Sequence, residues 1–297
     1  MDIINDILHI IIVILTLSVC SIGIFITWKN YGTDYDREYK KLILIQLSFG
    51  VLSGVVGLVS RCEIIIFNDY FILHYGYFSY YDFDIIIYKI IMGCYIFITG
   101  IDISFPSAVI ISRYLIVCKS VKLTFKKVVL LTFLPISISI VNFYSGYIIN
   151  YKITPVKFII SSIIIGIFYA TNCIIISIFY QKYMKFMELR SSIMSERTKR
   201  KHKEFSRIIL FQALIPSTIG CIPIFLYFLF FCFNYHFSEP IYVTPTVHCF
   251  SLVPCLNGLF FIFLSSKNRR TFLKIFKFII AYFKYIVLVR KTSTSKN

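Results

Sequence analysis

The sequence has few charged residues for its length. Only 15% of its 297 residues are Asp, Glu, Lys or Arg, whereas charged residues make up about 25% of an ordinary soluble domain. Hydrophobic residues account for 58% of the chain and aromatic residues for 18%. This composition excludes an ordinary soluble domain. Apolar runs of roughly 18 or more residues recur along the chain, which predicts an all-α membrane protein with several spans.

Motifs of several other protein classes are also missing. The sequence has no HExxH, GxSxG or phosphate-loop motif, and its five histidines have no ligand spacing. We therefore expect no enzyme, no catalytic residues, no metal site and no cofactor. The nine cysteines lack paired spacing such as CxxC, and most lie inside apolar runs, where a small buried hydrophobic residue is the expected role. No internal repeat relates one half of the chain to the other.

The apolar runs predict a bundle of seven transmembrane helices. The predicted spans are residues 7–28, 42–66, 85–118, 128–149, 158–180, 208–233 and 244–264. The acidic start and the length of the first run indicate a membrane span and not a cleaved signal peptide. Residues 181–207 form the longest polar connection, and we expect a loop there. Residues 266–290 form a last, amphipathic segment, so residues 1–290 are expected to make one seven-transmembrane domain, followed by a short polar tail, 291–297.

Positive charge is unequally shared between the two sets of loops. Most of the 31 lysines and arginines lie after spans one, three and five or in the tail. The opposite side has Arg61, Lys89, Lys152 and Lys157. Because basic residues are retained on the cytoplasmic side, the amino terminus is predicted to lie outside and the tail inside.

The segment at 266–290 is predicted to be a basic amphipathic helix. Several basic residues share one face of it, and apolar residues fill the remainder. The basic face consists of Lys267, Arg270, Lys274, Lys277 and Lys284. Such a helix lies on the inner leaflet and is attracted by anionic lipid. The net charge of +17 does not indicate a nucleic-acid partner, because the charges cluster between the apolar runs.

The third span, residues 85–118, has polar residues on one helical face. Asp102 and Arg113 are about three helical turns apart, and Tyr95 and Tyr88 continue the same face outward. A carboxylate near the middle of a membrane is costly, so Asp102 is expected to face protein or water. We therefore interpret this helix as the axis of a helical bundle that passes a solute or a signal across the membrane.

Two arrangements of Asp102 remain open. Asn257 in span seven and Ser53 in span two fall at a similar depth, counted from the inner ends of the helices. One hypothesis is a polar cluster of these three residues that is hydrated or holds a sodium ion or a proton. The other is a permanently protonated carboxyl group that is hydrogen-bonded to a neighbouring backbone carbonyl.

The third span ends in Ser112-Arg113-Tyr114, just before a basic loop. Taken alone, Arg113 is expected to be a snorkelling residue that anchors the helix end. Seven spans, an outside amino terminus and an arginine-aromatic pair at this place together resemble the G-protein-coupled receptor superfamily. That resemblance implies a heterotrimeric G protein as partner and a plasma-membrane location.

A closer resemblance is carried by residues around the sixth and seventh spans. Ser195-Glu196-Arg197-Thr198-Lys199, then Phe211-Gln212-Ala213-Leu214-Ile215-Pro216, and later Pro254-x-x-Asn257 are similar to segments of the nematode serpentine chemoreceptors of the Str, Srh and Srd kind. The resemblance implies olfactory signal transduction, with the receptor in sensory neuron cilia. It also implies G-protein coupling through Arg113, Tyr114, Arg197 and Lys199. Pro216 and Pro223 are then a hinge in span six, or else a static kink.

Three departures from the receptor pattern affect its mechanism. Ser112 replaces the acidic residue common before the arginine, so an inactive-state ionic contact is in doubt. Gly258 stands where many receptors have proline. The second outer loop is short and has no cysteine, so the usual disulfide to span three is not expected.

The outer half of the bundle is predicted to hold an aromatic pocket with few charges. Such a pocket suits a small, mostly neutral organic molecule. Its predicted lining residues are Tyr88, Tyr95, Thr99, Tyr169, Asn172, Phe225 and His248. For His248, a core histidine with satisfied hydrogen bonds is the competing interpretation.

Three competing functions are weighed against a chemosensory receptor. A vertebrate-type bitter taste receptor shares the length and the short outer loops, but the Gln-x-x-x-Pro in span six favours the nematode group. A transporter or ligand-gated channel using Asp102 is the alternative from another class, and transporters are often built from repeats. An insect-type odorant-gated channel has its termini on the sides opposite to those that the charges indicate.

Overall fold

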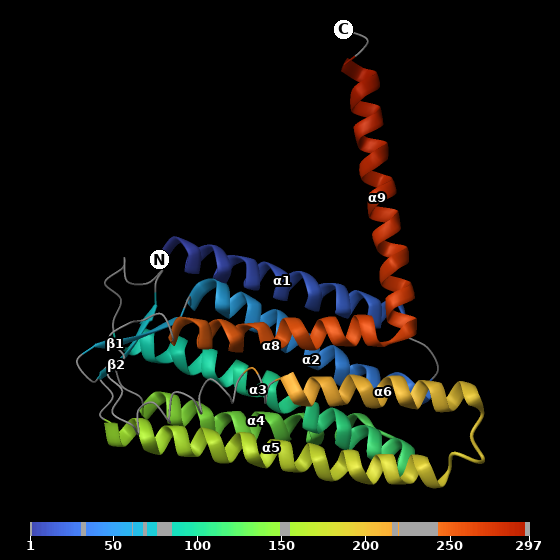
Figure 1. The fold of residues 1–297 in the computed structure, drawn as a ribbon, viewed down its shortest axis with the longest axis horizontal. Coiled ribbons are helices and arrows are strands. Elements are labelled where there is room, and N and C mark those ends of the chain that lie inside the picture. Colours follow the sequence, from blue (N-terminus) through green and yellow to red (C-terminus); the bar gives the residue numbers. More distant parts are fainter. Residues whose placement is uncertain are drawn as a thin grey trace.

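A bundle of long helices makes up most of the described chain, with a small β-hairpin at one end (Figure 1). The structure is a computed structural model that describes residues 2–30, 34–60, 62–67, 70–75, 85–148, 155–215, 219 and 243–294. Its helices are α1 (Asp2–Lys29), α2 (Asp34–Ser60), α3 (Ile85–Cys118), α4 (Phe125–Ile148), α5 (Pro155–Leu189), α6 (Glu196–Ile215), α8 (Val243–Leu264) and α9 (Ser266–Thr294). Its strands are β1 (Cys62–Phe67) and β2 (Tyr70–Tyr75).

Three of the described helices contain segments that are long and apolar enough to cross a membrane. These are Asp6–Lys29 in α1, Tyr39–Val59 in α2 and Gly93–Cys118 in α3. A shorter apolar segment, Ser251–Leu264, lies in α8. The helical, membrane-spanning character that the composition predicts is therefore confirmed, whereas the count of seven spans stays a prediction. Most of the predicted sixth span, 216–233, lies outside the described residues.

The predicted second span, 42–66, includes residues that are not helical. Helix α2 ends at Ser60, and the residues that follow form β1, which pairs antiparallel with β2. In this register Cys62 lies opposite Tyr75 and Phe67 lies opposite Tyr70. The run Ile64–Ile66 is β-branched, and such residues favour strands. A short apolar run is ambiguous between helix and strand in the sequence, which explains the difference.

The polar connection at 181–207, expected as a loop, is largely helical. Helix α5 continues to Leu189, and α6 begins at Glu196. The backbone N–H of Thr198 bonds to the Ser195 hydroxyl at 3.4 Å, which is the geometry of an N-terminal cap. Lysine, arginine and glutamate are good helix formers, so this charged sequence continues the helices.

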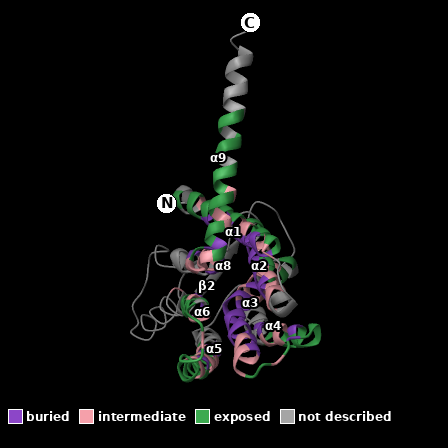
Figure 2. Ribbon diagram, turned by 90° about the vertical axis from the view of Figure 1, so that its right-hand side faces the viewer, coloured by how far each residue is buried: buried purple, intermediate pink, exposed green. Residues whose placement is uncertain are grey.

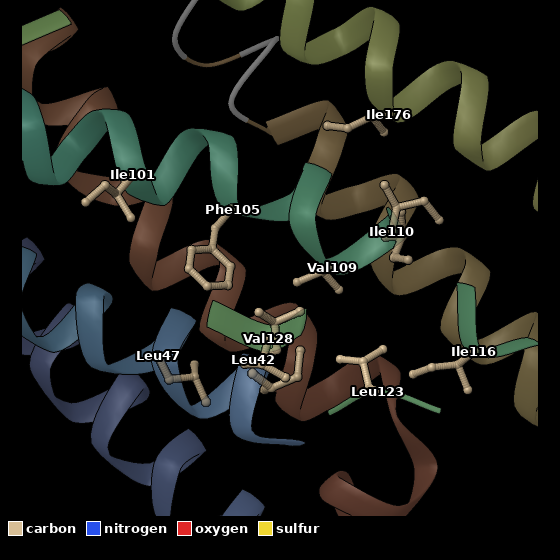
Figure 3. Packing of buried hydrophobic residues seen from close by; sticks show 12 residues of the cluster. Leu42, Leu47, Ile101, Phe105, Val109, Ile110, Ile116, Leu123, Val128 and Ile176 are labelled. Atoms are coloured by element: carbon tan, nitrogen blue, oxygen red, sulfur yellow. The ribbon is translucent and has the colours of Figure 1, made fainter. Parts of the chain in front are cut away.

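Helix α3 lies at the centre of the bundle and packs against α2, α4, α5, α6 and α8. Every residue from Gly100 to Ile110 is buried, and Figure 2 shows α3 as the most continuous buried stretch. Its apolar side chains form one cluster with neighbouring helices (Figure 3). The buried members are Leu42, Ile43, Leu47, Ile101, Phe105, Val109, Ile110, Ile116, Leu123, Val128, Ile176 and Ile209. The predicted organising helix is thus the one around which the core is packed.

Glycines let α1 approach α2 and α8 closely. A Cβ atom on Gly50 of α2 would lie 2.7 Å from the Cys20 sulfur of α1, and one on Gly258 of α8 would lie 2.8 Å from Val19 of α1. Small residues at such contacts allow helix backbones to pack tightly in membranes. Gly258, noted above as a departure from the usual proline, therefore has a packing role.

Helix α9 leaves the bundle crosswise at the end opposite the hairpin (Figure 1). Its first residue, Ser266, bonds to Glu204 of α6, and α9 packs against α8 and α1 near its own beginning. Its exposed residues include large apolar side chains such as Phe276, Phe278 and Tyr285. A helix in this position has the orientation expected for a segment lying along a membrane surface.

Candidate functional site

A small polar cavity lies between α1, α2, α3, α6 and α8. Its volume is about 10 Å³, enough space for about one water molecule. Four of its lining residues are polar and nearly fully buried. The lining residues are Cys20, Ile43, Gln46, Leu47, Gly50, Asp102, Gln212, Pro254, Asn257 and Phe261. We call this site the polar cavity.

The polar cavity contains Asp102 and Asn257, two of the three residues predicted to form a polar cluster. Asp102 is 3% exposed and Asn257 is 5% exposed. The third residue, Ser53, is also buried, and its hydroxyl donates a hydrogen bond to the Asp102 carboxylate. The structure therefore brings together the three residues that were placed at one depth from the sequence.

Two glutamines complete the cavity, and sequence reasoning did not select either for this role. Gln46 is about two helical turns from Ser53 on α2, so a search for polar residues on one face would have found it. Gln212 belongs to the Gln-x-x-x-Pro motif of α6, and its Nε2 donates to the Asn257 carbonyl at 3.4 Å. Gln212 thus connects α6 to α8 at the cavity.

The polar cavity presents more acceptors than donors. Among its described lining residues, three buried side-chain oxygens have no hydrogen-bond partner: Asp102 Oδ2, Gln212 Oε1 and Asn257 Oδ1. The Nε2 of Gln46 is a buried donor without a partner. Buried polar groups are normally satisfied by protein or by ordered water. This set of atoms suits one small species that offers positive charge or hydrogen-bond donors, such as water or a monovalent cation.

A second cluster surrounds Arg113 near the C-terminal end of α3. Its guanidinium carbon lies 4.7 Å from the ring centre of Phe205 on α6 and 5.4 Å from that of Tyr39 on α2. It also hydrogen-bonds to Tyr183 on α5. Cation–π contacts are worth about 0.5–2 kcal/mol each, more when water is excluded. Arg113 of α3 therefore contacts three neighbouring helices, α2, α5 and α6, and does not extend freely from the bundle. We call Arg113, Tyr39, Phe205, Tyr183 and His202 the Arg113 cluster.

Tyr183 and His202 connect α5 to α6 within this cluster, beyond the predicted membrane spans. The Tyr183 hydroxyl lies 2.6 Å from Nδ1 of His202. Burial raises the pKa of Tyr183 to about 12. Burial, together with the positive charges of Arg113 and Lys201, lowers the pKa of His202 to about 4. At neutral pH the phenol is therefore the donor, and a neutral imidazole accepts.

The other residues predicted for G-protein coupling are placed at the same end. Tyr114 contacts Phe179 of α5 edge to face, with ring centres 5.4 Å apart. Lys199 makes an exposed ion pair with Glu196 at 2.7 Å. Arg197 is in α6, but its side chain lies outside the described residues, as do Pro216 and Pro223.

The structure describes the surroundings of some of the residues predicted for the ligand pocket. Tyr95 bonds to Ser251 of α8 at 3.1 Å. Asn172 donates to the Ile103 carbonyl of α3 at 3.1 Å, and the His248 ring lies 5.9 Å from that of His9 on α1. Thr99 is half-buried. Phe225 and the side chains of Tyr88 and Tyr169 lie outside the described residues, so the pocket stays a prediction.

A comparison with models of protein families finds a match in the second half of the chain. Residues 150–273 match the family model described as serpentine type 7TM GPCR chemoreceptor Str. The match confirms the predicted resemblance. No curated protein sequence matches the chain. The matched stretch includes α5, α6, α8 and the start of α9, together with Gln212, His202 and Asn257.

Both sites combine matched and unmatched parts of the chain. Asp102 and Arg113 lie before the matched residues, whereas Asn257 and Gln212, which line the same cavity as Asp102, and Phe205, which contacts Arg113, lie within them. Ser53 and Tyr39 of α2, which contact Asp102 and Arg113, also lie before the match.

Proposed function

We propose that this chain binds a small organic ligand from outside and activates a heterotrimeric G protein inside. The observation that carries the proposal is the match of residues 150–273 to a chemoreceptor family of the G-protein-coupled receptor class. The predicted signalling residues gather at the inner end of the bundle, where α3, α5 and α6 meet. Their position supports coupling to a cytoplasmic partner at that end.

The test is nucleotide exchange on a G protein in membranes that contain the receptor. A panel of small, neutral, mostly aromatic odorants is applied to cells that co-express the chain and a broadly coupling G protein. We expect at least one compound to raise exchange of radiolabelled GTP analogue over receptor-free membranes. Odorant-evoked ion current that persists without G protein would instead favour the transporter or channel alternative.

The proposed orientation places the amino terminus and the hairpin outside, and α6, α9 and the Arg113 cluster inside. The unequal distribution of lysine and arginine supports it. An epitope tag before Met1 is expected to bind antibody on intact cells, and a tag after Asn297 only after permeabilisation. The reverse pattern would contradict the orientation. Location in sensory neuron cilia belongs to the same proposal and is tested by imaging the tagged receptor.

We also propose that α9 lies on the anionic inner leaflet. Its exposed basic residues Lys267, Arg270, Lys274, Lys277 and Lys284 stand beside exposed apolar side chains. Each basic residue near such a surface contributes about 1 kcal/mol. A soluble peptide of residues 266–290 should bind vesicles with phosphatidylserine much more tightly than neutral vesicles. Replacing Lys274, Lys277 and Lys284 by glutamine should reduce that binding at least tenfold, and unchanged binding would exclude the charge-based anchor.

A further inference from the structure

The inner end of α6 is attached to the rest of the bundle by aromatic and polar contacts. Phe205 stacks on Arg113 of α3, and its ring centre also lies 5.9 Å from that of Tyr39 and 6.0 Å from that of Tyr183. His202, one turn earlier, accepts the hydrogen bond from Tyr183 of α5. In addition, the Ser206 hydroxyl donates to the Tyr180 hydroxyl at 2.9 Å. Three residues on one face of α6 thus bind α2, α3 and α5.

None of these contacts needs a carboxylate beside Arg113. Residue 112 is a serine whose hydroxyl donates to its own helix, at the Val109 carbonyl, at 2.7 Å. The Glu204 carboxylate of α6 instead accepts from the Ser266 hydroxyl at 2.6 Å and from the Ser266 backbone N–H at 3.2 Å. The guanidinium of Arg113 is therefore positioned by rings and by a phenol.

We propose that Tyr183 and His202 are positioning residues that hold α6 and Arg113 in the resting arrangement. Their hydrogen bond joins α5 to α6, and Tyr183 also bonds Arg113, so a single phenol links three helices. Breaking this link releases the inner end of α6 and frees Arg113 for a cytoplasmic partner. The inference rests on the proposed function for its signalling consequence, but its structural part is independent of any G protein.

The link requires a neutral His202, which makes it sensitive to acid. Among the described residues, the charged or titratable groups shown to interact with His202 are Arg113 on α3, Tyr183 on α5 and Lys201 on α6. Helix α8, which also packs against α6, has no Asp, Glu, Lys or Arg between Val243 and Leu264. No carboxylate among these groups would stabilise a protonated imidazole, so protonation opposes the resting arrangement.

The direction and size of the effect of acid follow from the pKa of His202 in the resting and in the released state of the receptor. In the resting state its pKa is about 4, and in a released, hydrated α6 it returns to about 6.5. Because the released state binds the proton more tightly, the resting state is favoured above pH 6.5 and loses its advantage as the pH falls. At pH 6 the ratio of released to resting receptor rises about fourfold over its value at pH 7.5.

The experiment uses the full-length receptor in membranes and measures two things. The first is the distance between spin labels at Lys126 of α4 and Lys203 of α6, both exposed at the inner end. The labels are attached to noncanonical amino acids because the chain has nine cysteines. The second is ligand-independent nucleotide exchange on a co-expressed G protein.

Removing either partner is expected to release α6. His202→Ala should raise the population at longer label distances, and basal exchange, about fivefold, the effect of one lost hydrogen bond. Tyr183→Phe should raise both at least as much, because it also removes the bond to Arg113. The double variant should not exceed Tyr183→Phe, because the His202 contact is already lost in that variant. His202→Gln restores an acceptor without a titratable group, so it should return the resting distance and abolish the response to pH 6.

The matched control is Ser177→Ala, which removes an exposed hydroxyl from the same helix α5 and should change neither readout. Unchanged label distances in both Tyr183→Phe and His202→Ala would overturn the inference, whatever the G protein does. Longer distances with no exchange from any variant or odorant would support the inference and contradict the proposed G-protein function. If one variant fails to reach the membrane, the other and His202→Gln still decide the outcome.

Discussion

Arg113→Ala is expected to abolish G-protein activation while most of the receptor still reaches the cell surface. Arg113 is the charged centre of the cluster at the inner end of α3 and contacts Phe205 and Tyr39 with its guanidinium plane. Its loss removes two cation–π contacts, worth about 0.5–2 kcal/mol each, so some loss of stability is expected. Coupling should fall at least tenfold, because the group proposed to engage the partner is gone.

The measurement is odorant-stimulated nucleotide exchange, normalised to surface receptor counted by the extracellular tag. Arg113→Lys keeps the charge but not the planar stacking, and we expect it to retain surface expression with weakened signalling. Lys119→Ala, an exposed basic residue just after α3, serves as the charge-loss control and should signal nearly normally. Full signalling by Arg113→Ala would reduce Arg113 to an anchor of the helix end.

The direction of the change in signalling distinguishes two roles within the Arg113 cluster. Loss of Tyr183 or His202 is expected to raise basal signalling, whereas loss of Arg113 is expected to remove it. A merely structural cluster would respond to all three substitutions in the same direction, through lower stability. The opposite signs are therefore a stronger test than the size of any single effect.

Much of the central helix could be predicted from the sequence because its pattern is local. Residues 85–118 form one continuous apolar run, and α3 has the same bounds. The spacing of Asp102 and Arg113 on that helix fixes their relative depth. Counting from helix ends then placed Asn257 and Ser53 near Asp102, as the structure shows.

Features that depend on helix rotation or on contacts between distant segments were not predicted. Gln46 and Gln212 enter the polar cavity because α2 and α6 are rotated toward α3, and apolar runs without a clear polar face do not specify such rotations. The Tyr183–His202 bond joins two helices across a stretch that was expected to be a loop. In the β1 segment, an apolar run was too short to distinguish a strand from a helix.

Asp102→Asn is expected to change the balance between resting and active receptor. The carboxylate is buried in the polar cavity with Ser53 as a donor, and its Oδ2 faces the same small space as the free oxygens of Gln212 and Asn257. Because Gln212 belongs to α6 and Asn257 to α8, a species bound there stabilises one arrangement of these helices. An amide at residue 102 keeps the shape but removes the negative charge, so it weakens attraction for a cation or a proton.

The measurement is the thermal stability of purified receptor, with odorant response in cells as the second readout. If the cavity holds sodium, replacing choline by sodium at constant ionic strength should raise the melting temperature of the native receptor, since binding to the folded state stabilises it. If it holds a proton, stability should instead depend on pH. Asp102→Asn should lose either dependence, while Ser107→Ala, a buried hydroxyl of α3 bonded to its own helix, should keep it. A native receptor that responds to neither sodium nor pH would favour the permanently protonated carboxyl group, and persistence of the dependence in Asp102→Asn would exclude Asp102 as its source.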